Sequence, residues 1–190
     1  MRVGIDLDGV CYDFADSFRR YLSVTNRTEY KVAFGEPDKW HFYRDWGMTD
    51  DEFVNHCHLG ADLGIIFGQG SPRDDAPSAL QFIKAMGNSI HIVTDRSFGR
   101  SLGTNSSERN TIKWLTRWEI PYDTIDFSSD KTSVKTDVFV EDKLDNYDAL
   151  VASGVDCYLV ERPWNIDSGD CRKRVKSIQE FASIVGNMSV

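Results

Sequence analysis

The sequence predicts an α/β fold in which a mostly parallel sheet of about five strands is flanked by helices and carries a small helical insertion after the first strand. Two observations lead to this prediction. Short runs rich in Val and Ile alternate along the chain with amphipathic stretches of helical spacing, which is typical of strands buried on both faces. The alternation breaks once, in a long region near the N-terminus that contains no convincing buried strand.

The expected strands are all short apolar runs. They are Arg2–Leu7, Ser89–Thr94, Thr124–Ser128, Asp137–Val140 and Val155–Glu161. A helix is expected after the second strand, because "NSSERNTIKWLTRW" begins with an Asn-x-x-Glu capping pattern at Asn105. Three other amphipathic stretches stop at a glycine, as helices often do. These glycines are Gly87, Gly154 and Gly186, and the last of the three stretches starts at Cys171.

The region from about Ser17 to Asp75 reads as a helical insertion. It contains "TDDE" at Thr49, a capping box that starts a helix, and many aromatic residues. We therefore expect a core domain of residues 1–16 and 76–190 and a helical cap of residues 17–75. An insertion at the carboxyl end of a strand lies over the crevice where such sheets bind ligands. The alternative is a helical subdomain that only packs its own aromatic side chains.

Composition excludes several classes of function. The chain has 190 residues, enough for one domain or one domain with an insertion, and a formal net charge of -8. This charge disfavours binding to polymeric nucleic acid or to an anionic membrane surface. No apolar run is long enough to cross a membrane, and the N-terminus does not resemble a signal peptide. Four scattered cysteines without a CxxC pair fit reduced thiols, so we expect a cytoplasmic protein.

The first strand ends in "DLDGV", which places Asp6 and Asp8 two residues apart with Gly9 behind them. Two neighbouring carboxylates are costly unless a cation or a shared proton relieves their repulsion. Gly9 permits a tight turn and a close ligand. The pair therefore indicates either a metal site or an acid/base pair. The alternative is a strand-end cap followed by a solvated turn.

Other strand ends carry chemically active side chains. Thr94 ends the second strand, and its hydroxyl with the N–H groups of Asp95 and Arg96 can hold an anion. Lys131 and Lys135 follow the third strand as cations for a phosphate. Glu141 and Asp142 follow the fourth strand. Because the carboxyl ends of parallel strands share one edge of the sheet, we expect these groups to meet in one crevice. The run Arg162-Pro163-Trp164 after the last strand either touches this crevice or forms only a structural turn.

In this order, four motifs resemble the haloacid dehalogenase (HAD) superfamily of phosphotransferases. They are "DLDGV", Thr94 in "IVTDRS", Lys131 in "SDKTSV" and "EDKLD" from Glu141. More narrowly, the chain resembles the 5′(3′)-deoxyribonucleotidase family, because the cap is rich in aromatic residues, "NTIKWL" leads into the third strand and Lys131 lies ten residues before the acidic pair. The chain departs from this family at Glu141, where an Asp is usual. The resemblance implies a Rossmann-like, HAD-like core with a cap.

The resemblance also implies roles for the site residues. Asp6 would be the nucleophile that forms an aspartyl-phosphate, and Asp8 the general acid and base. Thr94, Asp95 and Arg96 would bind phosphate oxygens. Lys131, which fits the family spacing better than its rival Lys135, would neutralise charge on the phosphoryl group.

The implied cofactor is Mg²⁺, with Asp6, the backbone carbonyl of Asp8 and Asp142 as ligands and Glu141 ordering a bound water. The implied substrate is a small phosphomonoester, namely a nucleoside monophosphate, and the oligomeric state stays open, with a homodimer as one option. Four cap aromatics are candidates to stack on the base. They are Trp40, Phe42, Trp46 and Phe67.

Three other functions remain to be weighed. A HAD phosphatase for another small phosphomonoester, such as a sugar phosphate, would use the same residues with a different cap. A catalytically weak nucleotide-binding HAD protein would also keep these motifs. A phospho-accepting receiver domain is disfavoured, because such domains are shorter and carry their acidic pair at the end of the first strand, whereas here the pair follows the fourth.

Overall fold

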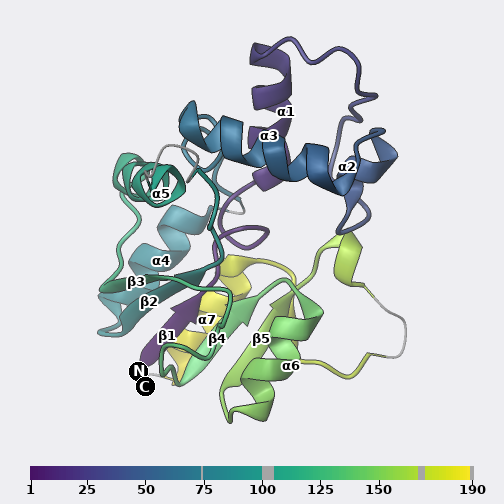
Figure 1. The fold of residues 1–190 in the computed structure, drawn as a ribbon. Coiled ribbons are helices and arrows are strands. Elements are labelled where there is room, and N and C mark those ends of the chain that lie inside the picture. Colours follow the sequence, from purple (N-terminus) through teal and green to yellow (C-terminus); the bar gives the residue numbers. More distant parts are fainter. Residues whose placement is uncertain (74, 100–104, 167–169, 189–190) are drawn as a thin grey trace.

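The computed structural model describes residues 1–73, 75–99, 105–166 and 170–188. Among these residues, six parallel strands form one sheet in the order β3-β2-β1-β4-β5-β6 (Figure 1). The strands are β1 (Arg2–Ile5), β2 (Ser89–Thr94), β3 (Thr124–Phe127), β4 (Val138–Glu141), β5 (Asp156–Val160) and β6 (Arg174–Val175). The predicted parallel α/β fold is confirmed, and each of the five expected strands is present within a few residues of its expected bounds.

The sixth strand, β6, was not predicted, because the last helix was expected to start at Cys171. Instead, Arg174 and Val175 pair with the end of β5, and α7 (Ile178–Met188) starts later. The start is fixed by Ser177, whose hydroxyl accepts from the backbone N–H of Glu180, while the Glu180 carboxylate accepts from the N–H of Lys176. A strand of two residues is too short to show a hydrophobic period.

Helices cover both faces of the sheet. The helices are α4 (Ala76–Ala85), α5 (Ser106–Arg117), α6 (Leu144–Ala152) and α7. Alternate residues of β4 separate the two sides: Val138 and Val140 join one buried cluster with side chains of α4, α5 and α7, whereas Phe139 joins another with side chains of α6. This two-sided core holds the strand ends in fixed positions.

A separate helical layer lies between β1 and α4 in the sequence, and Figure 1 shows it above the end of the sheet where β1 leads into α1. It contains α1 (Phe14–Val24), α2 (Phe42–Asp45) and α3 (Asp50–Asp62). The predicted capping box at Thr49 and Glu52 is confirmed at the start of α3. The layer buries its own cluster of side chains around Phe18 and Trp46.

The chain enters and leaves this layer side by side. The N–H of Asp13 donates to the carbonyl of Ser71 at 3.0 Å, and the N–H of Arg73 donates to the carbonyl of Cys11 at 2.8 Å. Helix α1 begins at Phe14 and therefore spans the expected boundary after residue 16. The division into a core and a cap stays a prediction. No helix in the described part of the chain has the length and apolar character needed to span a membrane.

Candidate active site

A cavity of about 450 Å³ lies between the carboxyl ends of the strands and the helical layer. Charged side chains from the strand ends line one side of it, namely Asp6, Asp8, Lys131, Glu141 and Asp142. Aromatic side chains of the helical layer line the other side, among them Phe14, Trp40, Phe42, Phe53 and Phe67. The cavity therefore combines a polar, ionisable floor with apolar walls, the arrangement common in sites for small organic ligands.

Asp6 and Lys131 form a buried ion pair at the floor. The Lys131 ammonium lies 2.6 Å from Asp6 Oδ1 and donates to the carbonyl of Val93 at 2.8 Å. Burial raises the pKa of Asp6 to about 7; Lys131 opposes this rise and the nearby Glu141 adds to it. Burial alone would lower the pKa of Lys131, but the carboxylates of Asp6 and Glu141 raise it above its ordinary value. Lys131 is therefore a permanent cation at neutral pH.

One lysine does not balance the negative charge at this floor. Carboxylate oxygens of Asp6, Glu141 and Asp142 lie within 4.8 Å of one another, and all three residues are buried. Glu141 Oε1 accepts from the N–H groups of Asp142 and Lys143, whereas its Oε2 is buried with no partner among the described residues. Burial, followed by Glu141 and Asp6, raises the pKa of Asp142 well above its usual range. An all-oxygen set with an unpartnered buried oxygen fits a divalent cation such as Mg²⁺.

The Asp8 carboxylate stands apart from this acidic cluster and is held by Arg96. The guanidinium donates to both oxygens of Asp8, at 2.9 and 2.8 Å. Arg96 also donates to the Thr111 hydroxyl at 2.9 Å and lies over the rings of Tyr12 and Phe67. Its side chain is buried and does not line the cavity. The family resemblance implies a phosphate-binding role for Arg96, and nothing in the sequence pattern indicates this pair with Asp8.

The other expected phosphate-binding residues lie in different places. Thr94 is fully buried, and its hydroxyl has no partner in the described part of the chain. Asp95 lines the cavity, whereas Thr94 does not. Lys135 is exposed and away from the cavity, and its carbonyl accepts from Arg2. Of the two candidate lysines, the structure thus brings only Lys131 to the floor.

Three of the four candidate base-stacking residues line the cavity: Trp40, Phe42 and Phe67. Trp40 is 45% exposed, and the ammonium of Lys143 lies 5.3 Å from the centre of its ring. Trp46 lines only a smaller hollow, because its ring is buried between Phe18 and Phe42 in the cluster of the helical layer.

Two residues of the turn after β5 contact the site and were not assigned to it from the sequence. The indole N–H of Trp164, which lines the cavity, donates to Asp142 Oδ2 at 3.0 Å. Arg162 Nε donates to the carbonyl of Gly9 at 2.6 Å. The one sequence signal for these residues is the Arg-Pro-Trp run after β5. Its two interpretations are contact with the crevice and a purely structural turn, and the structure shows the contact.

Comparisons with known proteins identify the family and the fold. The family described as "5′ nucleotidase, deoxy (Pyrimidine), cytosolic type C protein" matches residues 1–188. The chain belongs to this family. Among curated proteins, it is 27% identical over 162 residues to a protein of Chlorobaculum tepidum named "Putative 5′(3′)-deoxyribonucleotidase", a match that covers 80% of this chain and 75% of the relative.

Solved structures share the fold of this type C nucleotidase. D,D-heptose 1,7-bisphosphate phosphatase from Burkholderia thailandensis is 14% identical, with a TM-score of 0.55 and 96% of each chain covered. A HAD-superfamily hydrolase from Ehrlichia chaffeensis is 14% identical, with a TM-score of 0.53, and the match covers 98% of this chain and 96% of that one. The predicted HAD-like fold and family resemblance are confirmed, and family membership makes the chain a phosphomonoester hydrolase of the nucleotidase type.

Proposed function

We propose that this nucleotidase hydrolyses deoxynucleoside monophosphates through a covalent aspartyl-phosphate on Asp6. The observation that carries the proposal is the pairing of Asp6 with Lys131 beside two further carboxylates, at the floor of an aromatic-walled cavity. A carboxylate can attack phosphorus when neighbouring positive charge offsets the charge of the phosphate. The name of the Chlorobaculum tepidum relative supports a deoxynucleotide as substrate.

Asp6, the backbone carbonyl of Asp8 and Asp142 would hold Mg²⁺, with Glu141 ordering a bound water. When bound, this cation would supply the positive charge that lets a dianionic phosphate approach the acidic floor. Lys131 adds a second positive charge at the same place. Of the three residues expected to hold the phosphate oxygens, Asp95 lines the cavity, so its N–H group would make this contact.

The reaction proceeds in two steps. An Asp6 oxygen bonds to phosphorus as the bond between phosphorus and the nucleoside oxygen breaks. Asp8, which would enter this step in its protonated form, gives its proton to the nucleoside oxygen. Asp8 then takes a proton from a water molecule, whose oxygen attacks the phosphorus and releases inorganic phosphate and the Asp6 carboxylate. Asp8 lies at the cavity wall and is a quarter exposed, so it is accessible to both partners.

The helical layer, residues 17–75 in the proposed division, would act as a cap that closes over the substrate. Its separate buried cluster and the hydrogen bonds between the adjacent segments by which the chain enters and leaves it support this role. Trp40, Phe42 and Phe67 would pack against the base, and the volume of about 450 Å³ is within the range of small-ligand sites. Trp46 would support the ring of Phe42 from behind.

The test is phosphate release from a panel of deoxynucleoside, nucleoside and sugar monophosphates, with Mg²⁺ and with a chelator. Chelator-sensitive release that favours deoxynucleotides is expected. Asp6→Asn should lower turnover by several orders of magnitude, because an amide cannot replace the nucleophile. Asp145→Asn, an exposed carboxylate in the same motif, is the matched control and should leave turnover unchanged. A preference for sugar phosphates would contradict the substrate, and an active Asp6→Asn would contradict the covalent step.

A further inference from the structure

We infer that the turn Arg162–Asn165, which follows β5, is a positioning element for the proposed metal ligand Asp142, and that the indole N–H of Trp164 aims its carboxylate. The inference rests on the proposed function, because it assigns Asp142 to the metal. It concerns residues that lie outside the four motifs.

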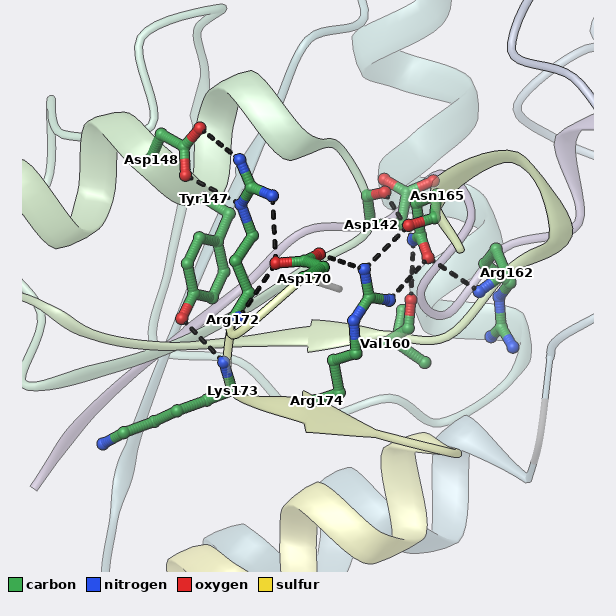
Figure 2. Close-up of polar contacts among 10 residues, drawn as sticks. All are labelled: Asp142, Tyr147, Asp148, Val160, Arg162, Asn165, Asp170, Arg172, Lys173 and Arg174. Atoms are coloured by element: carbon green, nitrogen blue, oxygen red, sulfur yellow. Dashed lines mark hydrogen bonds and ion pairs between the residues drawn. The ribbon is translucent and has the colours of Figure 1, made fainter. Parts of the chain in front are cut away.

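The turn holds Asp142 at two points. Trp164 Nε1 donates to the carboxylate oxygen Oδ2 at 3.0 Å. Asn165 Nδ2 donates to the backbone carbonyl of Asp142 at 2.8 Å, and Figure 2 shows the Asn165 amide directed at this residue. A ligand gripped at both its carboxylate and its main chain has little freedom to rotate away from the cluster.

An indole suits this position electrostatically. Trp has an N–H donor and no acceptor, and it is neutral. It therefore holds Asp142 Oδ2 without adding a positive charge that would compete with a cation, and it leaves the other oxygen of the carboxylate available. Groups that orient a metal ligand from behind in this way commonly change metal affinity or activity by 10–100-fold when removed.

Asn165 is locked by its own hydrogen bonds. Its Nδ2 donates to two carbonyls, of Asp142 and Val160, and its Oδ1 accepts from the N–H of Arg162 and from Arg174 Nη1 (Figure 2). An Asn amide has two donor hydrogens and two acceptor lone pairs, so all four are used. The residue is 3% exposed. Only one orientation of this buried amide satisfies all of its neighbours.

A chain of ion pairs fastens the turn to α6 and the sheet edge. Arg174 donates to the carbonyl of Asn165 and pairs with Asp170. Asp170 also pairs with Arg172, whose guanidinium donates to both oxygens of Asp148 on α6, at 2.8 and 2.7 Å (Figure 2). The position of the turn is thus set by elements outside the cavity.

The same turn also contacts the loop that carries Asp8. Arg162 Nε donates to the carbonyl of Gly9, and a Cβ added at Gly9 would lie 2.0 Å from Asp142 Oδ2 and 3.2 Å from the Trp164 ring. Gly9 has φ +79°, so it is needed both for its backbone angle and for this close approach. The turn, the Asp8 loop and Asp142 therefore form one packed unit.

The experiment measures Mn²⁺ binding to the free protein, by the loss of the free-ion electron paramagnetic resonance signal, without substrate. Trp164→Phe keeps the ring and removes the N–H, and the dissociation constant for Mn²⁺ should rise by about tenfold. Trp118→Phe, at the exposed end of α5, is the matched control and should bind as the wild type does. Excess Mg²⁺ should restore most of the lost phosphate release in Trp164→Phe.

Wild-type Mn²⁺ affinity in folded Trp164→Phe would overturn the role of the indole. Should that variant fail to fold, Asn165→Asp decides by the same titration, because a carboxylate cannot donate to the carbonyl of Asp142; wild-type affinity there would overturn the role of the turn. Wild-type protein that binds Mn²⁺ but releases no phosphate from nucleotides would instead overturn the proposed function alone. Wild-type protein that binds no Mn²⁺ would overturn both.

Discussion

Arg96 matters for the proposed chemistry through a single neighbour, Asp8. Its planar guanidinium meets both oxygens of Asp8, and it is itself fixed by the Thr111 hydroxyl and the rings of Tyr12 and Phe67. A buried Arg without a carboxylate partner would be strongly unfavourable. Asp8 and Arg96 therefore depend on each other, and the geometry of the proposed acid/base is set by a residue outside the cavity.

Replacing Arg96 by Lys tests this dependence, because an ammonium cannot make the two parallel hydrogen bonds of a guanidinium. We expect kcat/KM for a deoxynucleoside monophosphate to fall roughly tenfold or more, up to the 10²–10⁴-fold that general acid catalysis contributes when it is lost completely. The loss should be much smaller for p-nitrophenyl phosphate, whose leaving group needs no proton. Arg109→Lys, exposed on α5, serves as the control. Equal losses on both substrates would show that Arg96 only supports the fold.

The site was predictable from the sequence as far as strand ends determine it. Asp6, Glu141 and Asp142 lie together because parallel strands place their carboxyl ends at one edge. The contacts of Arg96 and Trp164 were not predictable, since each depends on how a loop folds back onto a residue far away in the sequence. Arg96 is 88 residues from Asp8, and Trp164 is 22 residues from Asp142.

At the scale of elements, five strands, including β3 at one edge of the sheet, and the capping box of α3 were predictable, whereas β6 at the other edge was not. Runs of Val and Ile marked the first five strands, and Thr49 with Glu52 marked α3. The strand β6 has only two residues and takes its position from pairing with β5. The contacts between the helices of the helical layer could not be predicted from sequence patterns either. His56 provides an example.

His56 on α3 links the helical layer through two hydroxyls. Its Nδ1 lies 3.0 Å from the hydroxyl of Tyr21 on α1, and its Nε2 lies 3.0 Å from the hydroxyl of Tyr30. Burial lowers the pKa of His56 below its ordinary value, and Arg27 lowers it further, whereas Glu29 and Glu52 partly oppose this. The folded state therefore prefers the neutral imidazole.

This preference predicts a pH-dependent stability. Below pH 6.5 the unfolded state binds a proton that the folded state does not, so the contribution of His56 is complete above that pH and is lost as the pH falls through the lower folded pKa. We expect the free energy of unfolding in urea to fall from pH 7 to pH 5 more steeply in the wild type than in His56→Gln. His91, whose pKa is also lowered by burial, is retained in both proteins and cancels in the comparison. Parallel pH profiles would contradict the prediction.

At the scale of the whole molecule, the acidic cluster at the cavity floor lowers the stability of the fold that carries it. The chain carries a net charge of -8 and still buries three carboxylates at one point, with Lys131 as the nearest cation. Such a cluster is costly without a further positive charge. In the proposed function a bound cation would relieve this cost, and so the residues proposed to prepare the cavity for phosphate should weaken the metal-free fold.

Asp142→Asn should expose this conflict directly. Without metal, Asp142 weakens the fold at neutral pH, because burial and its acidic neighbours disfavour its ionised form, which the unfolded chain adopts freely. A neutral amide should therefore raise the thermal midpoint of unfolding by a few degrees, since about 1 kcal/mol corresponds to roughly 2–4 °C for a chain of this size. The amide oxygen can still accept from Trp164. With Mg²⁺ the wild type should instead melt above the variant. An ion at 100 times its dissociation constant stabilises the protein that binds it by about 2.7 kcal/mol, and Asp142→Asn has lost a carboxylate that is proposed to bind Mg²⁺.

The measurement is a thermal melt of both proteins in chelator and in excess Mg²⁺, with Asp145→Asn as the control that should match the wild type in both conditions. A wild type that melts above Asp142→Asn in chelator would mean that the three carboxylates are not in conflict in the metal-free protein, and that proton uptake by one of them already relieves the repulsion. If the variant melts higher in chelator and the wild type melts higher in Mg²⁺, the same three side chains determine both the stability and the proposed metal binding.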